Sequence, residues 1–474
     1  MQSKKVAIVG GGVAGASTAL FLGSMGLEVV LFERERDLVN GPPFCHLHAG
    51  GNLYPDISDE QCVTLLRQSI DFAKTFPQSI DYRPTVIALP SYGCNLKVND
   101  LLPRLKKLQH AYRTMIQEDP TNQCLGENSA YFQTYSREKL LALRERPLPD
   151  TPTTHDEWMI PLAKYLDFDH VQFPLILVQE YGINLFHCSA SLSLALQALP
   201  NVTLYFQSPV TNITLDQGKW NVHYQHNQTP QHEEVDYLIN AAGFRTGTID
   251  EMLGVECTKM VEFKAAYITQ WEKGTTTPFP EVIFHGKRGT PQGMGQFTPY
   301  PEGYFQLHGM TPKITLYPDG LVKNSPHRCQ PQLPSKFLEK IELGWHQEEI
   351  KTRTHHAIEH LARFIPSFKN AHVGSKPLFG AQQIPGDDPS LRVAEVAFPR
   401  PHYARCEIVK VSSVIDMIQA IIKDLKEHQL LDAHATLPPI ALHHPPELLE
   451  ADAITLATHR GYPKGLGQIG RRYP

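Results

Sequence analysis

The sequence lacks several features that would place it in a specialised class. It has eight cysteines in 474 residues, but none forms a C-x-x-C pair, so zinc ribbons and thioredoxin-type motifs are excluded. Its 44 Lys and Arg are outnumbered by 49 Asp and Glu, so it also lacks the dense basic surface that a general nucleic-acid-binding protein needs. Scattered cysteines in a long chain indicate reduced thiols, and we expect a cytoplasmic protein without a bound metal.

Long uninterrupted apolar runs are also missing. The stretch 6–32 is mostly apolar, but it contains Glu28 and six glycines. A membrane-spanning helix needs about 20 continuous apolar residues, so we predict no transmembrane segment here. The stretch instead divides into a strand (Lys5–Val9), a helix (Ala16–Met25) and a second strand (Leu27–Phe32).

A glycine-rich turn, Gly10-Gly11-Gly12-Val13-Ala14-Gly15, joins the first strand to the helix. In such a turn Gly10 permits the tight bend, Gly12 lets the backbone approach a pyrophosphate, and Gly15 lets the helix pack on the strand. The amino end of the helix attracts phosphate. Glu33 lies about 20 residues further on, where a carboxylate accepts hydrogen bonds from a ribose and argues against NADP. The pattern predicts a dinucleotide site for FAD or NAD.

The glycine turn followed by Glu33-Arg34 resembles the FAD-binding signature of the glutathione-reductase superfamily. Later segments are similar to the D-amino-acid oxidase and sarcosine oxidase family. One of them, His48-Ala49-Gly50-Gly51, resembles a His-Ala-Ala-Gly segment of dimethylglycine and sarcosine dehydrogenases, in which the histidine is bonded to the flavin. The resemblance implies that these four residues contact FAD and that His48 lies in the active site. It leaves open whether FAD is attached covalently.

Two further places in the sequence carry the same resemblance. Val210 matches a valine whose backbone contacts adenine in the family. The segment Asn240-Ala241-Ala242-Gly243 is similar to the family's Asn-Ala-Ala-Gly segment, which implies that Ala241, Ala242 and Gly243 pack under the cofactor. Small residues there allow the backbone to come close to the pyrophosphate or ribose.

The closing segment, residues 405–415, resembles the family's loop, lysine and helix that cover the flavin. The family has Gly-His-Gly before the lysine, whereas this chain has Cys406-Glu407-Ile408 before Val409-Lys410. The resemblance implies cofactor contacts by Arg405, Cys406, Ile408, Val409 and Lys410. A positive helix end here would stabilise the negative charge of a reduced flavin.

From these segments we predict an α/β protein. Its Rossmann-like FAD-binding domain, a parallel sheet with helices, is interleaved with a mixed α+β substrate domain built on an antiparallel sheet. The FAD-binding pieces are 1–90, 170–255 and 372–430, the substrate-domain pieces are 91–169 and 256–371, and 431–474 form an irregular C-terminal arm. The arm could wrap the body of the chain or join it to a second copy as a homodimer.

The function predicted for this fold is an FAD-dependent oxidation of a small molecule, with hydride transfer from an amine or amino-acid C–H to flavin N5. The electrons would pass to O2 or a quinone. Two alternatives stay open: a 2-hydroxy-acid dehydrogenase that feeds a quinone, and a flavin-binding protein without catalysis. The catalytic candidates are His48, Tyr267, Tyr304, Arg405 and Lys410, and His46, His308 and Lys376 are further residues considered for the site.

Overall fold

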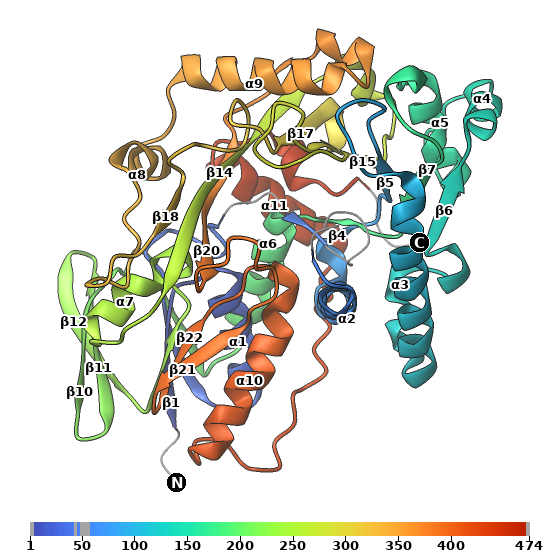
Figure 1. Cartoon of the computed structure of the whole chain (residues 1–474). Helices are drawn as coiled ribbons and strands as arrows, with labels where there is room; N and C mark the ends of the chain where they lie inside the picture. The colour runs from blue at the N-terminus through green and yellow to red at the C-terminus, as the bar shows by residue number, and fades with distance from the viewer. Residues whose placement is uncertain (1–3, 42–44, 48–56, 471–474) are drawn as a thin grey trace.

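The computed structural model describes residues 4–41, 45–47 and 57–470, and two large sheets organise them (Figure 1). The first sheet has six strands in the order β21-β22-β13-β1-β2-β9. Its strands are parallel except for the edge pair β21 and β22. The strands are β1 (Lys5–Val9), β2 (Glu28–Phe32), β9 (Val202–Tyr205), β13 (Tyr237–Asn240), β21 (Val396–Arg400) and β22 (Tyr403–Cys406).

Helices cover one face of this sheet, and a small three-stranded sheet covers the other. The apolar side chains of β1 and β2 alternate between these two cores, because successive residues of a strand point to opposite faces. The covering helices are α1 (Val13–Ser24), α2 (Asp59–Thr75), α6 (Leu185–Gln197) and α10 (Val414–Glu427). The small sheet consists of β10 (Val210–Asp216), β11 (Lys219–His226) and β12 (Thr229–Val235).

The second large sheet follows the order β18-β14-β17-β16-β15-β5-β7-β6, with β19 and β20 also paired to β14. Most of its pairs are antiparallel, and β5 with β15 is parallel. Its strands are β5 (Thr85–Ala88), β6 (Phe132–Tyr135), β7 (Leu175–Val178), β14 (Lys259–Gln270), β15 (Glu281–Phe284), β16 (Gly295–Pro299), β17 (Tyr304–Gly309), β18 (Leu321–Lys323), β19 (His372–Val373) and β20 (Leu378–Pro385). The predicted fold class, a parallel-sheet α/β domain combined with a largely antiparallel second sheet, is confirmed.

The remaining elements surround these sheets. Helix α9 lies along the outside of the second sheet in Figure 1, and α3, α4 and α5 form one end of the molecule. The helices are α3 (Val98–Glu118), α4 (Arg137–Arg144), α5 (His155–Tyr165), α7 (Thr246–Met252), α8 (Ser335–Glu342) and α9 (Gln347–Ala362). A short sheet links β3 (Cys45–His46), β8 (Gly182–Ile183) and β4 (Ile80–Asp81).

The two domains exchange more strands than the predicted boundaries imply. Strands β5, β7, β19 and β20 fall inside the segments assigned to the FAD-binding domain, yet all four belong to the second sheet. An apolar run predicts a strand but does not identify its partner, because pairing here joins residues far apart in sequence. One example is the register of Val86 with Val282.

The C-terminal arm is not irregular, contrary to the prediction. It contains α11 (Pro446–His459), which packs on α6. The Asn184 side chain donates hydrogen bonds to the carbonyls of Leu466 (3.0 Å) and Gln468 (3.0 Å), and Arg460 pairs with Asp37 at 2.7 Å. The prolines at 438–446 obscured this helix in the sequence, although a proline is well tolerated in the first turn of a helix. The arm therefore covers the body of its own chain.

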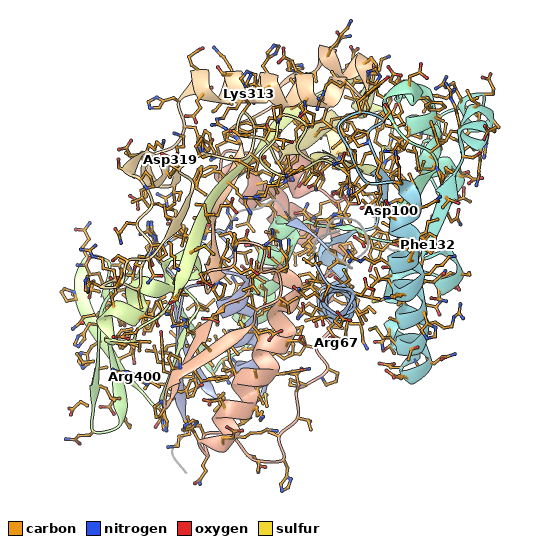
Figure 2. All side chains as sticks on the ribbon, viewed as in Figure 1. Arg67, Asp100, Phe132, Lys313, Asp319 and Arg400 are labelled. Carbon is orange, nitrogen blue, oxygen red and sulfur yellow. The ribbon has the colours of Figure 1, made fainter. Side chains whose placement is uncertain are left out.

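An ion pair joins two helices of the FAD-binding part. Arg67, labelled in Figure 2, projects from α2 and donates to Asp416 of α10 at 2.8 Å. Gln68 donates to the same carboxylate at 2.8 Å. These contacts fix the start of α10 against α2. Within the described part of the chain, no helix combines the length and the apolar character needed to cross a bilayer.

We predict that Phe297→Ala strongly destabilises the second sheet. Phe297 is fully buried, and its ring stacks on Phe305 with centroids 4.5 Å apart. Its removal leaves a cavity and should lower the free energy of unfolding by about 3–5 kcal/mol. Urea denaturation followed by circular dichroism measures this change, with Leu343→Ala as the control because Leu343 is 85% exposed. Equal unfolding midpoints for the two variants would contradict the prediction.

Candidate functional site

The glycine turn is shaped by two close backbone approaches. Gly10 has φ +106°, and a Cβ on it would lie 2.4 Å from the carbonyl oxygen of Ala241. A Cβ on Gly15 would lie 1.9 Å from the carbonyl oxygen of Gly10. Only glycine fits either position, because these distances are far below van der Waals contact. The turn thus draws β1, β13 and the start of α1 together.

Gly12 differs from the other two glycines because a Cβ built on it would meet nothing within 4 Å. It is the N-cap of α1, and no side chain caps the helix there. The first backbone N–H groups of an α-helix lack partners within the helix and carry a partial positive charge. Gly12, Val13 and Ala14 line a cavity, so these groups adjoin space that an anion can enter.

The Glu33 side chain stabilises the glycine turn by hydrogen bonds to backbone N–H groups. Its buried carboxylate accepts hydrogen bonds from the backbone N–H of Gly11 (2.6 Å) and of Glu35 (2.8 Å). Burial raises the pKa of Glu33, although both hydrogen bonds favour the ionised form. The neighbouring Arg34 is partly exposed and pairs with Glu35.

The cavity has a volume of about 910 Å³ and lies between the two large sheets, at the carboxyl ends of β1 and β13. Ligands of open α/β sheets bind at this edge. Residues 406 and 408–411, which precede α10, close part of it, and β14, β16, β17 and β20 contribute the opposite side. Among the described lining residues there are five Lys or Arg and three His but no Asp or Glu.

We call Lys264, Arg288, Arg392 and Lys410, together with His308, the basic wall of the cavity. Lys264 lies on β14, where its Nζ pairs with Glu262 at 2.8 Å and donates to Gln382 at 3.1 Å. Burial lowers the pKa of Lys264, Glu262 opposes this, and Arg288 and Arg392 lower it further. The positive groups of the wall are therefore close enough to repel one another.

His308 is a buried neutral imidazole within this wall. Burial lowers its pKa to about 3, and the nearby charges of Lys264, Arg288 and Lys410 contribute. At neutral pH one ring nitrogen is therefore an acceptor of hydrogen bonds, since a neutral imidazole has one donor and one acceptor nitrogen.

His46, which also lines the cavity, is protonated at neutral pH, whereas His308 is neutral. Its Nδ1 is 2.9 Å from Oε1 of Glu281, and its Nε2 is 3.4 Å from Oε2 of Glu180. Burial disfavours the charged ring, but the two carboxylates outweigh it and raise the pKa of His46 to about 9. Glu281 is held in turn by Arg83 at 3.2 Å and by Gln296 at 2.7 Å.

The structure brings many of the predicted cofactor residues to one cavity. The residues that line it are Gly12, Val13, Ala14, Ala241, Gly243, Cys406, Ile408, Val409 and Lys410. Val210 and Ala242 are not part of this lining, and Val210 lies on β10. His48, Ala49, Gly50 and Gly51 lie outside the described residues.

Three predicted catalytic residues do not reach the cavity. Tyr267 is fully buried in the aromatic core of the second sheet, with its hydroxyl 3.1 Å from that of Tyr317. Tyr304 packs beside α11 and the C-terminal segment. Arg405 pairs with Asp250 (3.1 Å) and Glu407 (2.7 Å) and is not among the described residues that line the cavity.

The sequence reasoning missed most of the basic wall. Lys264 stands within the buried strand β14, and a lysine inside an apolar strand is the signal that could have revealed it. Arg288 and Arg392 lie in loops between turn residues, where a positive charge usually means only a solvated surface. Lys376, also considered for the site, lies over the ring of Tyr462 instead.

The segment that contains the glycine turn is similar to a known protein family. A model of the DAO family, described as FAD dependent oxidoreductases, matches residues 5–136, which contain the glycine turn, α1 and β2. This segment is therefore similar to the DAO family of FAD-dependent oxidoreductases. The family prediction and the predicted cofactor, FAD, are thereby confirmed. No curated protein sequence matches the chain.

Solved structures agree with the FAD-dependent oxidoreductase fold over nearly the whole chain. Glycine oxidase from Geobacillus kaustophilus is 13% identical with a TM-score of 0.55, covering 94% of this chain and 100% of that one. The amino acid oxidase NikD, essential for nikkomycin biosynthesis, is 14% identical with a TM-score of 0.58, covering 94% and 100%. Glycerol-3-phosphate dehydrogenase from Bacillus halodurans, complexed with FAD, is 12% identical with a TM-score of 0.56, covering 98% and 74%.

The residues present fit FAD. The open space at Gly12 and the uncapped start of α1 suit a pyrophosphate. The same cavity, of about 910 Å³, is also lined by Lys264 and residues 408–411, so it includes space beyond the start of α1. The alternative interpretation of the glycine turn, an NAD-dependent enzyme, does not explain the match to a family of FAD-dependent enzymes.

We predict that Gly12→Ala weakens FAD binding without unfolding the chain. The new methyl group meets no protein atom but occupies space at the start of α1, where the backbone must approach the pyrophosphate. Affinity for FAD should fall at least about tenfold, whereas loss of the glycine N-cap costs about 1 kcal/mol of stability. Titration of the apoprotein with FAD, followed by flavin fluorescence, measures the change. Ser24→Ala, at the other end of α1, is the control, and unchanged affinity in Gly12→Ala refutes the assignment.

We also predict a pH dependence of stability that His46 controls. The folded pKa of about 9 exceeds the ordinary value of 6.5, so the folded state binds the extra proton between these values. This contribution is complete below pH 6.5 and is lost as the pH rises through 9, amounting to about 3 kcal/mol. Denaturation of wild type and His46→Gln across this range measures it. The variant should show the smaller slope, and identical slopes would contradict the charge state assigned to His46.

Proposed function

We propose that this FAD-dependent oxidoreductase oxidises the C–H bond beside the amino group of an anionic amine, such as an amino acid. The observation that supports it is the basic wall on a cavity with no Asp or Glu among its described lining residues. A carboxylate is attracted to Lys and Arg by charge-assisted hydrogen bonds. Glycine oxidase and NikD share the fold.

Four of the five residues of the wall can be given a part in the reaction. Lys264 and Arg288 bind the carboxylate and orient the C–H bond toward the flavin. His308, being neutral, accepts a hydrogen bond from the amine without adding a positive charge beside it. Lys410, which precedes α10, helps to stabilise the negative charge of the reduced cofactor.

When bound, FAD supplies the hydride acceptor. The substrate loses a hydride from carbon and a proton from nitrogen and leaves as an imine. Water then converts the imine to a carbonyl compound and ammonia. We expect either O2 or a quinone to reoxidise the cofactor.

A 2-hydroxy acid offers the wall the same carboxylate, so it is the second candidate substrate. Oxidation of a hydroxyl group gives a 2-oxo acid and no ammonia, and ammonia release therefore distinguishes the two reactions. The change from the family's Gly-His-Gly to Cys406-Glu407-Ile408 is the observation behind a flavin-binding protein without turnover.

The test is a screen of the purified holoprotein under argon with amines, amino acids of both configurations and 2-hydroxy acids. We expect amino acids to bleach the oxidised flavin band, and ammonia to appear once air or a quinone is admitted. Bleaching by hydroxy acids alone would replace the proposed substrate class. A flavin that no compound bleaches would mean that the chain binds FAD without catalysis.

A matched pair of variants tests the role of the wall in this reaction. Lys264→Gln should raise the half-saturating substrate concentration at least about tenfold, because a charge-assisted hydrogen bond is worth about 1.5–3 kcal/mol. Lys351→Gln removes an exposed lysine on α9 and should behave as wild type. If Lys264→Gln also behaves as wild type, Lys264 does not bind the substrate.

A further inference from the structure

The closing loop, residues 406–411, is bound by two neighbouring side chains of the second sheet. Gln383 donates a hydrogen bond from Nε2 to the carbonyl of Cys406 at 3.0 Å, and Gln382 donates one to the carbonyl of Val409 at 2.9 Å. Both glutamines line the cavity, as do Cys406 and Val409. The two hydrogen bonds therefore fix the path of the loop beside the space assigned to the cofactor.

The strand that carries both glutamines is itself fixed within the second sheet. β20 pairs with β14, with Gln382 opposite Glu262 and Gln383 opposite Val261. The closing loop follows β22 of the first sheet and leads into α10. The two hydrogen bonds thus join the two large sheets at the cavity, and β20 is the ordered element to which the loop is attached.

The side-chain amide of Gln382 is used at both ends. Its Oε1 accepts a hydrogen bond from Nζ of Lys264 at 3.1 Å, while its Nε2 donates to Val409. An ammonium group can only donate and a carbonyl can only accept, so the amide has one possible orientation here. A side chain that lacks either the acceptor or the donor would break this connection between Lys264 and the loop.

The amide of Gln383 ends a second chain of hydrogen bonds. Nζ of Lys259 donates to the hydroxyl oxygen of Thr246, and this hydroxyl donates to Oε1 of Gln383 at 3.0 Å. Gln383, the most exposed of these three residues, is only 5% exposed. Both chains start at a lysine of β14 and end at a carbonyl of the closing loop. Hydrogen bonds in such a chain polarise one another, so each is strengthened by the next.

We propose that Gln382 and Gln383 are positioning residues that fix the closing loop against the flavin part of FAD. The assignment rests on the proposed function only for the place of the flavin beside this loop, and it does not depend on the substrate. A loop that is already ordered loses less conformational entropy when the cofactor binds. The two glutamines should therefore raise the affinity for FAD.

Titration of the apoprotein with FAD, followed by flavin fluorescence, tests this proposal without any substrate. Gln382→Met and Gln383→Met keep the length of the side chain but remove both hydrogen bonds of the amide. Each should raise the dissociation constant of FAD at least about fivefold, as expected for the loss of about one hydrogen bond. An unchanged constant in either variant overturns the assignment for that residue.

Gln109→Met is the matched control. Gln109 lies on α3, outside the lining of the cavity, and its Nε2 donates to the carbonyl of Asn128 at 2.9 Å. This variant loses a comparable hydrogen bond and should bind FAD as wild type does. Urea unfolding of the apoproteins should give similar midpoints for all three variants. If one of the two test variants is much less stable than Gln109→Met, that glutamine stabilises the fold as a whole, and its positioning role is overturned.

The absorption spectrum of the bound flavin gives a second readout, which general stability does not affect. At saturating FAD, the visible bands of Gln382→Met and Gln383→Met should be displaced from those of wild type, because a displaced loop changes the polarity beside the ring. Gln109→Met should reproduce the wild-type bands. Identical bands in wild type and all three variants overturn the proposal.

The proposed function fails on a different result. If no amino acid bleaches the wild-type holoprotein, the proposed reaction is wrong, while the FAD dissociation constants and the spectra still decide the roles of Gln382 and Gln383. If amino acids bleach the flavin but both variants equal wild type in affinity and spectrum, the proposed function stands and the positioning role is overturned.

Discussion

The site depends on one steric constraint, the close approach of three backbone segments at the glycine turn. The carbonyl of Ala241 comes so near to Gly10, and that of Gly10 to Gly15, that no side chain fits between them. This contact lets α1 start directly at the end of β1 and aims its first N–H groups at the cavity. Because β1 and β13 are parallel, their carboxyl ends meet here, and the second sheet closes the space above them.

The charges around the cavity are arranged in two distinct ways. His46 is surrounded by Glu180 and Glu281, so its proton is retained and its charge is balanced within the protein. In the basic wall, Glu262 pairs with Lys264 and Arg288, and the wall lines a cavity that an anion can enter. The first arrangement balances a charge within the protein, whereas the second places positive groups at the cavity. For this reason the proposed substrate class is inferred from the basic wall and not from His46 with Glu180 and Glu281.

The sequence predicted correctly those secondary-structure elements that depend on neighbouring residues in the chain. Strand Lys5–Val9 has the predicted bounds, and the strand predicted over Leu27–Phe32 forms as Glu28–Phe32. It failed where distant residues decide the role of a side chain. For Arg405, next to the closing loop, the sequence could not show the ion pair with Asp250, which lies far away in the chain. Lys264, Arg288 and Arg392, the members of the wall that the sequence analysis missed, come from three separate segments that only folding brings together.

The cofactor site and the substrate site are connected if FAD extends from the start of α1 to the basic wall. A crystal structure of the holoprotein tests this most directly. It should show the pyrophosphate at Gly12–Ala14 and the flavin ring between residues 408–411 and Lys264, with the wall facing the hydride-accepting side of the ring. A flavin ring that lies elsewhere, with the wall turned toward solvent, would contradict the account of both the cofactor and the substrate.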